Sequence, residues 1–464
     1  MRRLSQNFFS IILSDVGRRL LGFLAVAYLA RKVGTANFGA INIGFTVLSY
    51  AMMVSSAGLN SFGTRSVAQG APPTIINDIL SVRLVTSSVA FGLVAFVALF
   101  FIPNDLTATL IILFNVSLFA QAVLLEWYFQ GREEMTVIGF GRFASAVLYL
   151  LLLLVLVRTP DDLMWVAFAS VAGDMLAAAI LFSTFKRQHA DFHFALHLSR
   201  WKSLFAEAFP IGVGSMMAHF SVNLPPLALG ILMTNSDVGI YSAASKLVFF
   251  MLMFDRVLST LLLPASSRLH TYTPERLLSV LSTALKWIIL IVLPLCVGGM
   301  LLADELLFLI YGAQYIQAAD IFRILIWYFS FTMLHTIYSV GLIAIEKEKI
   351  YSKVMFVSML IYTITIITGI LIFGILGAAV AVVVSEAVTL LMMRFRFERF
   401  MQVPFPIQTV KMIVAAILMG VVLLFLPPVH VLLSIAIGGT IYLGTLLATR
   451  ALTLHDITAL TKKA

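Results

Sequence analysis

The stretch "FSIILSDVGRRLLGFLAVAYLA" (residues 9–30) has the length of a membrane-spanning helix, yet it carries Asp15, Arg18 and Arg19. About 20 apolar residues cross a hydrocarbon core of ~30 Å. A charge at the helix centre costs ~2.5–3.5 kcal/mol, and each apolar residue returns only about 0.3–0.6 kcal/mol. We therefore expect the charged side of this helix to face water, a ligand or another helix rather than lipid.

The composition of the whole chain is that of a membrane protein. Of the 464 residues, 61% are hydrophobic and 11% are charged, whereas soluble proteins have roughly 25% charged residues. This composition excludes a set of soluble domains. Recurring apolar runs predict an all-α polytopic membrane protein with about fourteen transmembrane helices, at residues 9–30, 39–62, 80–102, 106–130, 136–157, 162–184, 204–226, 237–262, 282–303, 321–344, 353–373, 375–395, 408–426 and 429–449.

Basic residues gather on one side of the predicted topology. Most of the 31 lysines and arginines, Arg83 among them, are assigned to inner loops when the N-terminus is placed inside. The positive-inside rule then predicts that both termini are cytoplasmic. The net charge of +9 is explained by these loops, so it does not indicate nucleic-acid binding.

An internal repeat divides the chain. "GDMLAAAILFSTFKR" (173–187) aligns with "SEAVTLLMMRFRFER" (385–399), which pairs Asp174 with Glu386, and "FGAINIGF" (38–45) lines up loosely with "VGIYSAAS" (238–245). Both halves start on the same side, so the repeat is parallel, and duplicated halves around a central site are a transporter design. We predict six-helix lobes at 1–185 and 204–400, a cytoplasmic linker at 186–203, and two additional helices with a short cytoplasmic tail at 401–464.

The eighth predicted span, in "SKLVFFMLMFDRVL" (245–258), repeats the charge pattern of the first. Lys246 and Arg256 are ten residues apart, about 15 Å along a helix. The two spans would thus place cations at several depths, and arginine binds phosphate through a planar fork. The candidate binding residues for an anionic ligand are Arg18, Arg19, Lys246 and Arg256. Alternatively, Arg18 and Arg256 lie near the interface and extend to it.

Four carboxylates within the predicted spans are candidates for ion coupling or charge pairing. Asp15 can pair with Arg18 or Arg19 along one helix flank, and Asp255 can offset Arg256. Buried carboxylates in spans six and twelve could titrate and couple proton movement, or they could make polar helix–helix contacts. The set is Asp15, Asp174, Asp255 and Glu386. His219 could be a hydrogen-bonding residue of the core or could titrate near pH 6.5. Asn60 could shape a cavity or serve packing, and no metal site is predicted.

Enzyme motifs are absent from the sequence. There is no Walker A motif, no HExxH and no GxSxG. A membrane glycan polymerase or ligase would need a large external loop with reactive groups, and the predicted loops are short. Cys296 is the single cysteine, so no internal disulfide can form. We therefore expect a transporter rather than an enzyme.

Four segments resemble motifs of Wzx-type polysaccharide flippases. They are "LARKVGTANFGAINIGF" (29–45), "GLNSFGTRSVAQ" (58–69), "EWYFQGREEM" (126–135) and "VGIYSAASKL" (238–247). This family belongs to the multidrug/oligosaccharidyl-lipid/polysaccharide exporter superfamily. The resemblance covers most of the chain and is weakest over the last two spans.

The resemblance implies a V-shaped pair of six-helix lobes around a cationic cavity. The implied activity is transfer of an undecaprenyl-diphosphate-linked oligosaccharide from the cytoplasmic to the periplasmic leaflet of a bacterial inner membrane, for O-antigen-like surface polysaccharide. An ion gradient, of protons or sodium, would drive alternating access, and no other cofactor is expected. Partners would be membrane lipids, a polysaccharide polymerase and a chain-length regulator. The alternative is a cation-coupled multidrug exporter of the same superfamily, whose cavity should favour acids over arginines.

Overall fold

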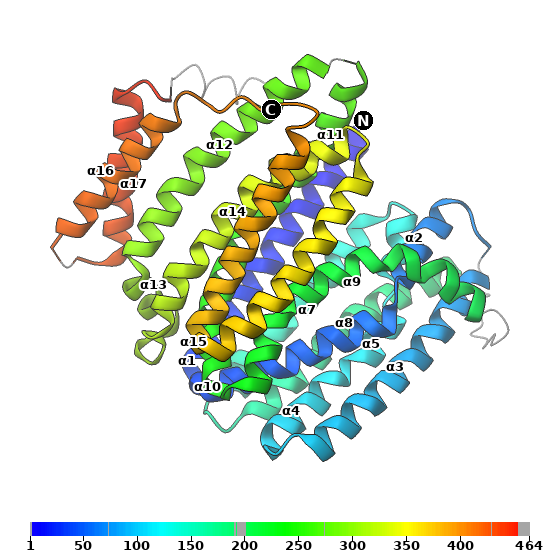
Figure 1. Ribbon diagram of the computed structural model, residues 1–464. Coiled ribbons are helices and arrows are strands. Elements are labelled where there is room, and N and C mark those ends of the chain that lie inside the picture. The colour runs from blue at the N-terminus through cyan, green and yellow to red at the C-terminus, as the bar shows by residue number, and fades with distance from the viewer. Residues whose placement is uncertain are drawn as a thin grey trace. The chain divides into compact units, whose positions relative to one another are not determined.

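The computed structural model describes residues 2–72, 74–189, 192, 201–272, 274–427 and 429–452. Over these residues the secondary structure is helical, with no strand, as Figure 1 shows. The prediction of an all-α protein is thereby confirmed. The predicted linker (186–203) and the C-terminal tail lie largely outside the described residues.

The number of membrane spans agrees with the sequence. Ten helices of the described part are long and apolar enough to cross a membrane. Two of them hold two predicted spans each, because α1 (Arg2–Ser56) bends at Gly34 (φ 81°) and α15 (Glu348–Phe397) bends at Gly374 (φ 60°). Glycine adopts positive φ without steric cost. Two shorter apolar helices, His219–Leu232 within α9 and α16 (Thr409–Phe425), complete the fourteen.

The chain forms two compact units, an N-terminal unit (Met1–Ser242) and a C-terminal unit (Ala243–Ala464). In the N-terminal unit, the long α1 packs against α4, α7 and α9, and α8 packs against α5 and α7. Its other helices are α2 (Leu59–Ala68), α3 (Thr74–Phe101), α4 (Asp105–Asn115), α5 (Ser117–Val123), α6 (Glu126–Gly131), α7 (Met135–Leu156), α8 (Leu163–Gln188), α9 (Trp201–Leu232) and the start of α10 (Asn235–Met251).

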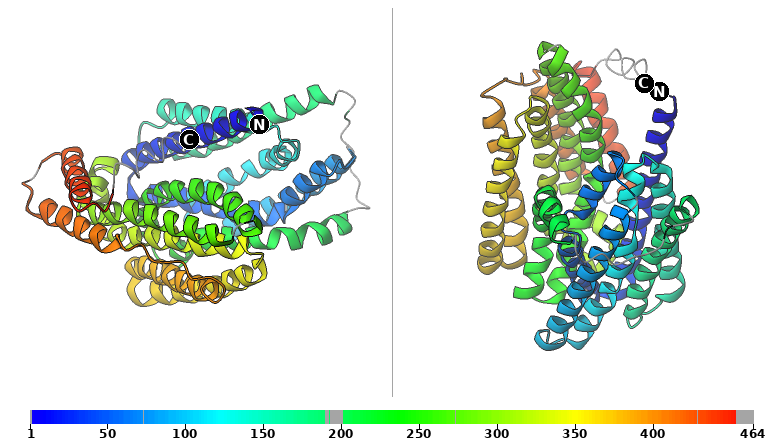
Figure 2. Two further views of the ribbon diagram at one scale, coloured as in Figure 1. Left: turned by 90° about the horizontal axis from the view of Figure 1, so that it is seen from above. Right: turned by 90° about the vertical axis from the view of Figure 1, so that its right-hand side faces the viewer.

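The C-terminal unit is centred on α14 (Ala318–Ala344), which packs along α15, α12 and α11. The last two helices, α16 and α17 (Val431–Ala448), lie side by side and reach the rest of their unit mainly through α12 (Figures 1 and 2). The remaining elements are the end of α10, α11 (Met253–Tyr272), α12 (Pro274–Leu301), α13 (Ala303–Tyr311) and a 3₁₀ turn at Ala313–Tyr315.

Small residues let two of the quoted motifs pack tightly. A Cβ on Gly63 would lie 2.4 Å from the Trp127 ring, and one on Gly131 would lie 2.7 Å from Thr64 O. The Thr64 hydroxyl also donates to Trp127 O at 3.1 Å. Close backbone approach therefore joins α2, from "GLNSFGTRSVAQ", to α6, from "EWYFQGREEM". Trp127 and its neighbours are buried in this contact.

A second glycine contact joins α1 to α10, and it is reciprocal, since each helix contributes one glycine that packs on the backbone of the other. A Cβ on Gly39 would lie 1.7 Å from Asn235 O, and a Cβ on Gly239 would lie 2.0 Å from Thr35 O. The Ser236 hydroxyl donates to Thr35 Oγ1 at 3.1 Å. Each glycine therefore packs against the backbone of the other helix, Gly39 on Asn235 and Gly239 on Thr35. Only glycine fits at either position. We call this contact the glycine crossing.

Arg83 lies within α3 and is 6% exposed, so the assignment of this residue to a loop is wrong. Its Nη1 donates to Leu124 O at 3.0 Å and its Nη2 donates to Gln121 O. These carbonyls lie at the end of α5, where the last C=O groups of a helix lack their usual partners one turn on, and Gln121 O also accepts a long bond of 3.3 Å from Leu124 N. Arg83 therefore holds the break between α5 and α6. The predicted span (80–102) begins six residues after the start of α3 at Thr74, but it already includes position 83.

Candidate functional site

The predicted cations of the first span lie in α1. Arg18 and Arg19 are both partly buried, within the candidate membrane span that begins at Gly17. Asp15 is part of the same helix, but its side chain lies outside the described part of the structure. The two arginines thus lie within an apolar span and not in a loop, as the sequence predicts, while their role in binding stays a prediction.

Lys246 and Arg256 lie on either side of the break between α10 and α11. Lys246 is partly buried between Ser245 and Leu247, both of which are buried, and Arg256 is exposed. Within the described residues of the C-terminal unit, no hydrogen bond or ion pair reaches the Lys246 ammonium. A lysine in this setting can accept an anionic partner.

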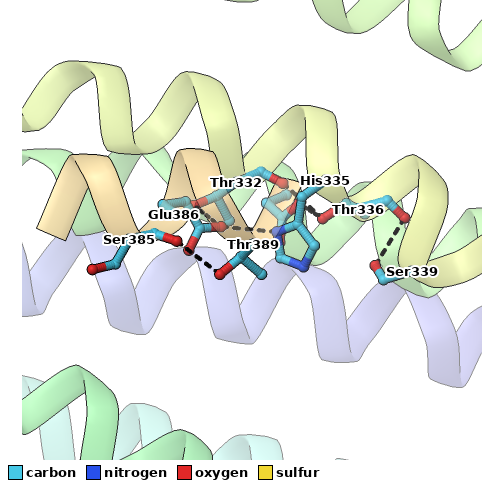
Figure 3. A network of polar contacts seen from close by, with 8 residues as sticks. Thr332, His335, Thr336, Ser339, Ser385, Glu386 and Thr389 are labelled. Atoms are coloured by element: carbon cyan, nitrogen blue, oxygen red, sulfur yellow. Dashed lines mark hydrogen bonds and ion pairs between the residues drawn. The ribbon is translucent and has the colours of Figure 1, made fainter. Parts of the chain in front are cut away.

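Three helices of the C-terminal unit bring a set of polar side chains together. His335 Nδ1 lies 2.8 Å from Glu386 Oε1, and the Thr332 hydroxyl donates to the same oxygen at 3.0 Å. Figure 3 shows these side chains, two from α14 and one from α15, pointing toward one another. The side chains of His335 and Glu386 are only 14% and 13% exposed. Imidazole and carboxylate therefore form a largely buried pair inside an apolar bundle.

Asp255, on α11, joins the same set through Thr336. The Thr336 hydroxyl donates to Asp255 Oδ1 at 2.6 Å, and His335 interacts electrostatically with both Asp255 and Glu386. Two of the four predicted carboxylates therefore converge on one face of α14. We call Asp255, Thr332, His335, Thr336 and Glu386 the polar cluster.

His335 was not among the residues selected from the sequence. The available signal was a polar stripe on an otherwise apolar helix, since Thr332, His335, Thr336 and Ser339 occur at i, i+3, i+4 and i+7. Such a stripe faces a neighbouring helix or a cavity. The sequence could not show that the partners would be Asp255 and Glu386.

Asp174 has an equivalent setting in the N-terminal unit. Gln121 Nε2, from α5, donates to Asp174 Oδ1, on α8, at 3.2 Å. The repeat offset of 212 that pairs Asp174 with Glu386 carries Gln121 to Met333, next to Thr332. In each unit the carboxylate of the sixth span of the repeat is thus bound by a polar side chain of the fourth span. Asp174 makes the polar helix–helix contact considered from the sequence.

Comparisons with known proteins place this geometry in context. A family model described as "Polysaccharide biosynthesis protein" matches residues 4–270. A Haloferax volcanii protein named "Probable low-salt glycan biosynthesis flippase" is 22% identical over 448 residues, which cover 90% of this chain and 89% of the relative. The capsular polysaccharide biosynthesis protein CapF of Staphylococcus aureus is 21% identical over 404 residues, covering 85% and 99%.

The fold also has a counterpart among solved structures. The lipid II flippase MurJ, solved in an inward closed conformation, matches 94% of this chain and 98% of its own with a TM-score of 0.79. Sequence identity is 15%, so this likeness concerns the fold. The chain therefore shares the fold of that protein over most of its length.

Proposed function

The chain belongs to the polysaccharide biosynthesis protein family, and from this premise we propose that it transfers an undecaprenyl-diphosphate-linked oligosaccharide from the cytoplasmic to the periplasmic leaflet of a bacterial inner membrane. Relatives along most of the chain carry names of glycan flippase and capsule biosynthesis. The transferred unit serves assembly of an O-antigen-like surface polysaccharide. Both termini are cytoplasmic, and a polymerase and a chain-length regulator act next.

The observation that carries this proposal is Lys246. A charged side chain within a membrane span is costly unless it pairs or meets water. No described residue of its own unit supplies a hydrogen bond or an ion pair to its ammonium. The diphosphate of a lipid carrier supplies the missing negative charge during transfer. Arg18, Arg19 and Arg256 add further cations, whose guanidinium groups bind phosphate oxygens in pairs.

The polar cluster is the proposed coupling site for the ion gradient. A largely buried carboxylate that pairs with an imidazole can bind and release a proton. The protonated pair is neutral, and the deprotonated pair keeps one negative charge on Glu386, which the hydrogen bonds from His335 and Thr332 stabilise. Hard cations such as sodium prefer a shell of oxygen ligands, and His335 Nδ1 occupies one position around Glu386. The cluster therefore favours a proton over sodium. Asp174, and Asp15 through its pairing with the arginines, are secondary candidates.

A cation-coupled multidrug exporter is supported less well. Its substrates carry positive charge, and Lys246 would repel them. Three carboxylates of the spans are already engaged by side-chain donors: Asp174 by Gln121, Asp255 by Thr336 and Glu386 by His335. The geometry thus offers cations to a ligand more readily than it offers anions.

The test is deletion of the gene, followed by restoration with wild-type, Lys246→Ala or Lys246→Arg protein. We expect the deletion to remove long-chain surface glycan and to trap lipid-linked repeat units on the inner leaflet. Lys246→Ala should fail to restore export at normal protein levels, and Lys246→Arg should restore part of it because the charge is kept. Lys353→Ala, at an exposed position of α15, is the matched control and should restore export. Unchanged surface glycan in a deletion strain without a related flippase would overturn the proposal.

A further inference from the structure

A cavity of about 330 Å³ lies within the N-terminal unit. Ligand pockets run from about 300 to 1,000 Å³, so this one suits a short stretch of a ligand and not a large molecule. It is bordered by parts of α1, α2, α3, α5 and α9. The uncharged polar residues of its described lining are Ser49, Ser55, Ser56, Asn60, Ser61, Gln121 and His219.

The lining is polar but almost uncharged. It supplies hydroxyl, amide and imidazole groups, with methionines such as Met52 and Met216 between them. Among the described lining residues Arg83 is the one permanent charge, and its terminal nitrogens donate to the main-chain carbonyls of Gln121 and Leu124. The described lining includes no carboxylate. Such a surface offers many neutral hydrogen bonds and flexible apolar patches, which disfavours a cationic ligand.

Two helix breaks border the cavity. Between α1 and α2, Ala57 and Gly58 adopt positive φ of 41° and 85°. Between α5 and α6, the chain leaves helical geometry at Leu124. Irregular backbone at membrane depth is tolerated only where protein buries it or where it lines a water-filled cavity, and transporter binding sites are often built from interrupted helices.

A glycine contact fixes α9 beside the cavity. A Cβ on Gly212 would lie 2.4 Å from Gly58 Cα, so the two backbones touch. His219 follows Gly212 by seven residues, which places it two turns along on the same face of α9. The contact between Gly58 and Gly212 therefore determines where the side chains of Met216 and His219 line the cavity. A backbone contact thus positions α9 beside the cavity.

We propose that this cavity binds sugar, specifically a short segment of the transported glycan. This inference rests on the proposed function and adds to it that the protein reads the glycan as well as the lipid-diphosphate carrier. Sugar hydroxyls both donate and accept, which matches the serines, Asn60, Gln121 and His219. Ser49 donates its own proton to Phe45 O at 2.9 Å, which leaves its oxygen to accept from a ligand. The C–H faces of a sugar ring pack on the methionines.

The test uses protection of an introduced cysteine. Cys296 is buried at 1% exposure, and Cys296→Ala gives a background without cysteine. Ser61→Cys is placed in the cavity lining, with Ser56→Cys as a second variant, and Gln69→Cys at the exposed end of α2 as the control. Each purified variant is treated with a charged methanethiosulfonate reagent. The added compounds are the oligosaccharide released by mild acid from the host's lipid-linked intermediate, and sodium pyrophosphate.

We expect the released oligosaccharide to slow modification of Ser61→Cys about tenfold when it is present at roughly ten times its Kd, with no effect on Gln69→Cys. Protection by pyrophosphate alone would overturn the sugar assignment. Absence of protection at both Ser61→Cys and Ser56→Cys, in variants that restore surface glycan, would overturn the site but leave the flippase proposal standing. Unchanged glycan in the deletion strain would instead remove the proposed function itself.

Discussion

His335 Nδ1 lies 2.8 Å from Glu386 Oε1, inside a bundle where both side chains are almost withdrawn from solvent. The next residue along α14, Thr336, binds Asp255. One turn of a single helix thus connects two carboxylates that are 131 positions apart in the chain. His335 and Thr336 are adjacent in sequence, so α14 brings Glu386 and Asp255 into one polar cluster.

The charge of Glu386 is expected to be needed for gradient-driven export. Glu386→Gln keeps the size of the side chain and an oxygen that can accept from Thr332, but removes the ionisable group. Export should therefore fall sharply while the protein stays folded. The measurement is uptake of lipid-linked glycan into proteoliposomes with and without an imposed proton gradient. Glu348→Gln, at an exposed position in the first turn of the same helix, is the control, and equal rates for both variants would exclude a coupling role.

His335 should contribute to stability as well as to coupling. His335→Ala leaves Glu386 with the Thr332 hydroxyl as its remaining hydrogen-bond donor from α14. A buried polar group that loses a partner costs about 1–3 kcal/mol, so we expect a lower midpoint of thermal unfolding in detergent. His335→Gln, which can still donate, should recover part of the loss. A midpoint unchanged by His335→Ala would show that the pair does not stabilise the bundle.

The glycine crossing should tolerate no side chain. Gly39→Ala places a Cβ 1.7 Å from Asn235 O, and the contact is with backbone that cannot rotate away. Overpacking typically costs up to about 3 kcal/mol, and we expect this variant to reach or exceed that value. Gly22→Ala is the matched control, because it also lies in α1 and no atom lies within 4 Å of the added carbon. Its expected effect is a gain of up to about 1 kcal/mol from helix propensity.

The same crossing can be used to ask whether α1 and α10 separate during transfer. The side-chain oxygens of Thr35 and Ser236 are 3.1 Å apart, which suits a disulfide in a Thr35→Cys/Ser236→Cys pair made in the Cys296→Ala background. If the crossing opens in each cycle, oxidation should stop export and a reducing agent should restore it. Each single cysteine variant, oxidised in parallel, is the control. Full export by the oxidised pair would show that this contact is permanent.

The sequence predicted the membrane-spanning fold well because apolar length is a local property. The bends at Gly34 and Gly374 separate the two spans within α1 and within α15, as the hydropathy pattern predicts. Arg83 shows the limit of this approach, since apolarity gave no sign that its guanidinium would be buried against the end of α5.

The polar cluster was predicted only in part, for a different reason. Asp255 and Glu386 stood out as charges in apolar runs, but His335 and the threonines carry no such signal on their own. These residues form a cluster only because α14 packs against α11 and α15, and this packing cannot be read from one sequence. The cavity was invisible for the same reason, because five helices contribute to its lining.

The glycine crossing also bears on how such a chain could have arisen. Thr35 corresponds to Asn235 and Gly39 corresponds to Gly239, each at a separation of 200 positions. Gly39 packs on Asn235 just as Gly239 packs on Thr35, so the contact is reciprocal. A contact in which each side presents the same surface to its counterpart is the kind found in two-fold homodimers. An ancestral gene encoding one half would have made this contact between two copies of itself, with a single glycine filling both places. Duplication and fusion would then have turned a dimer interface into an internal contact, after which the rest of each half was free to diverge.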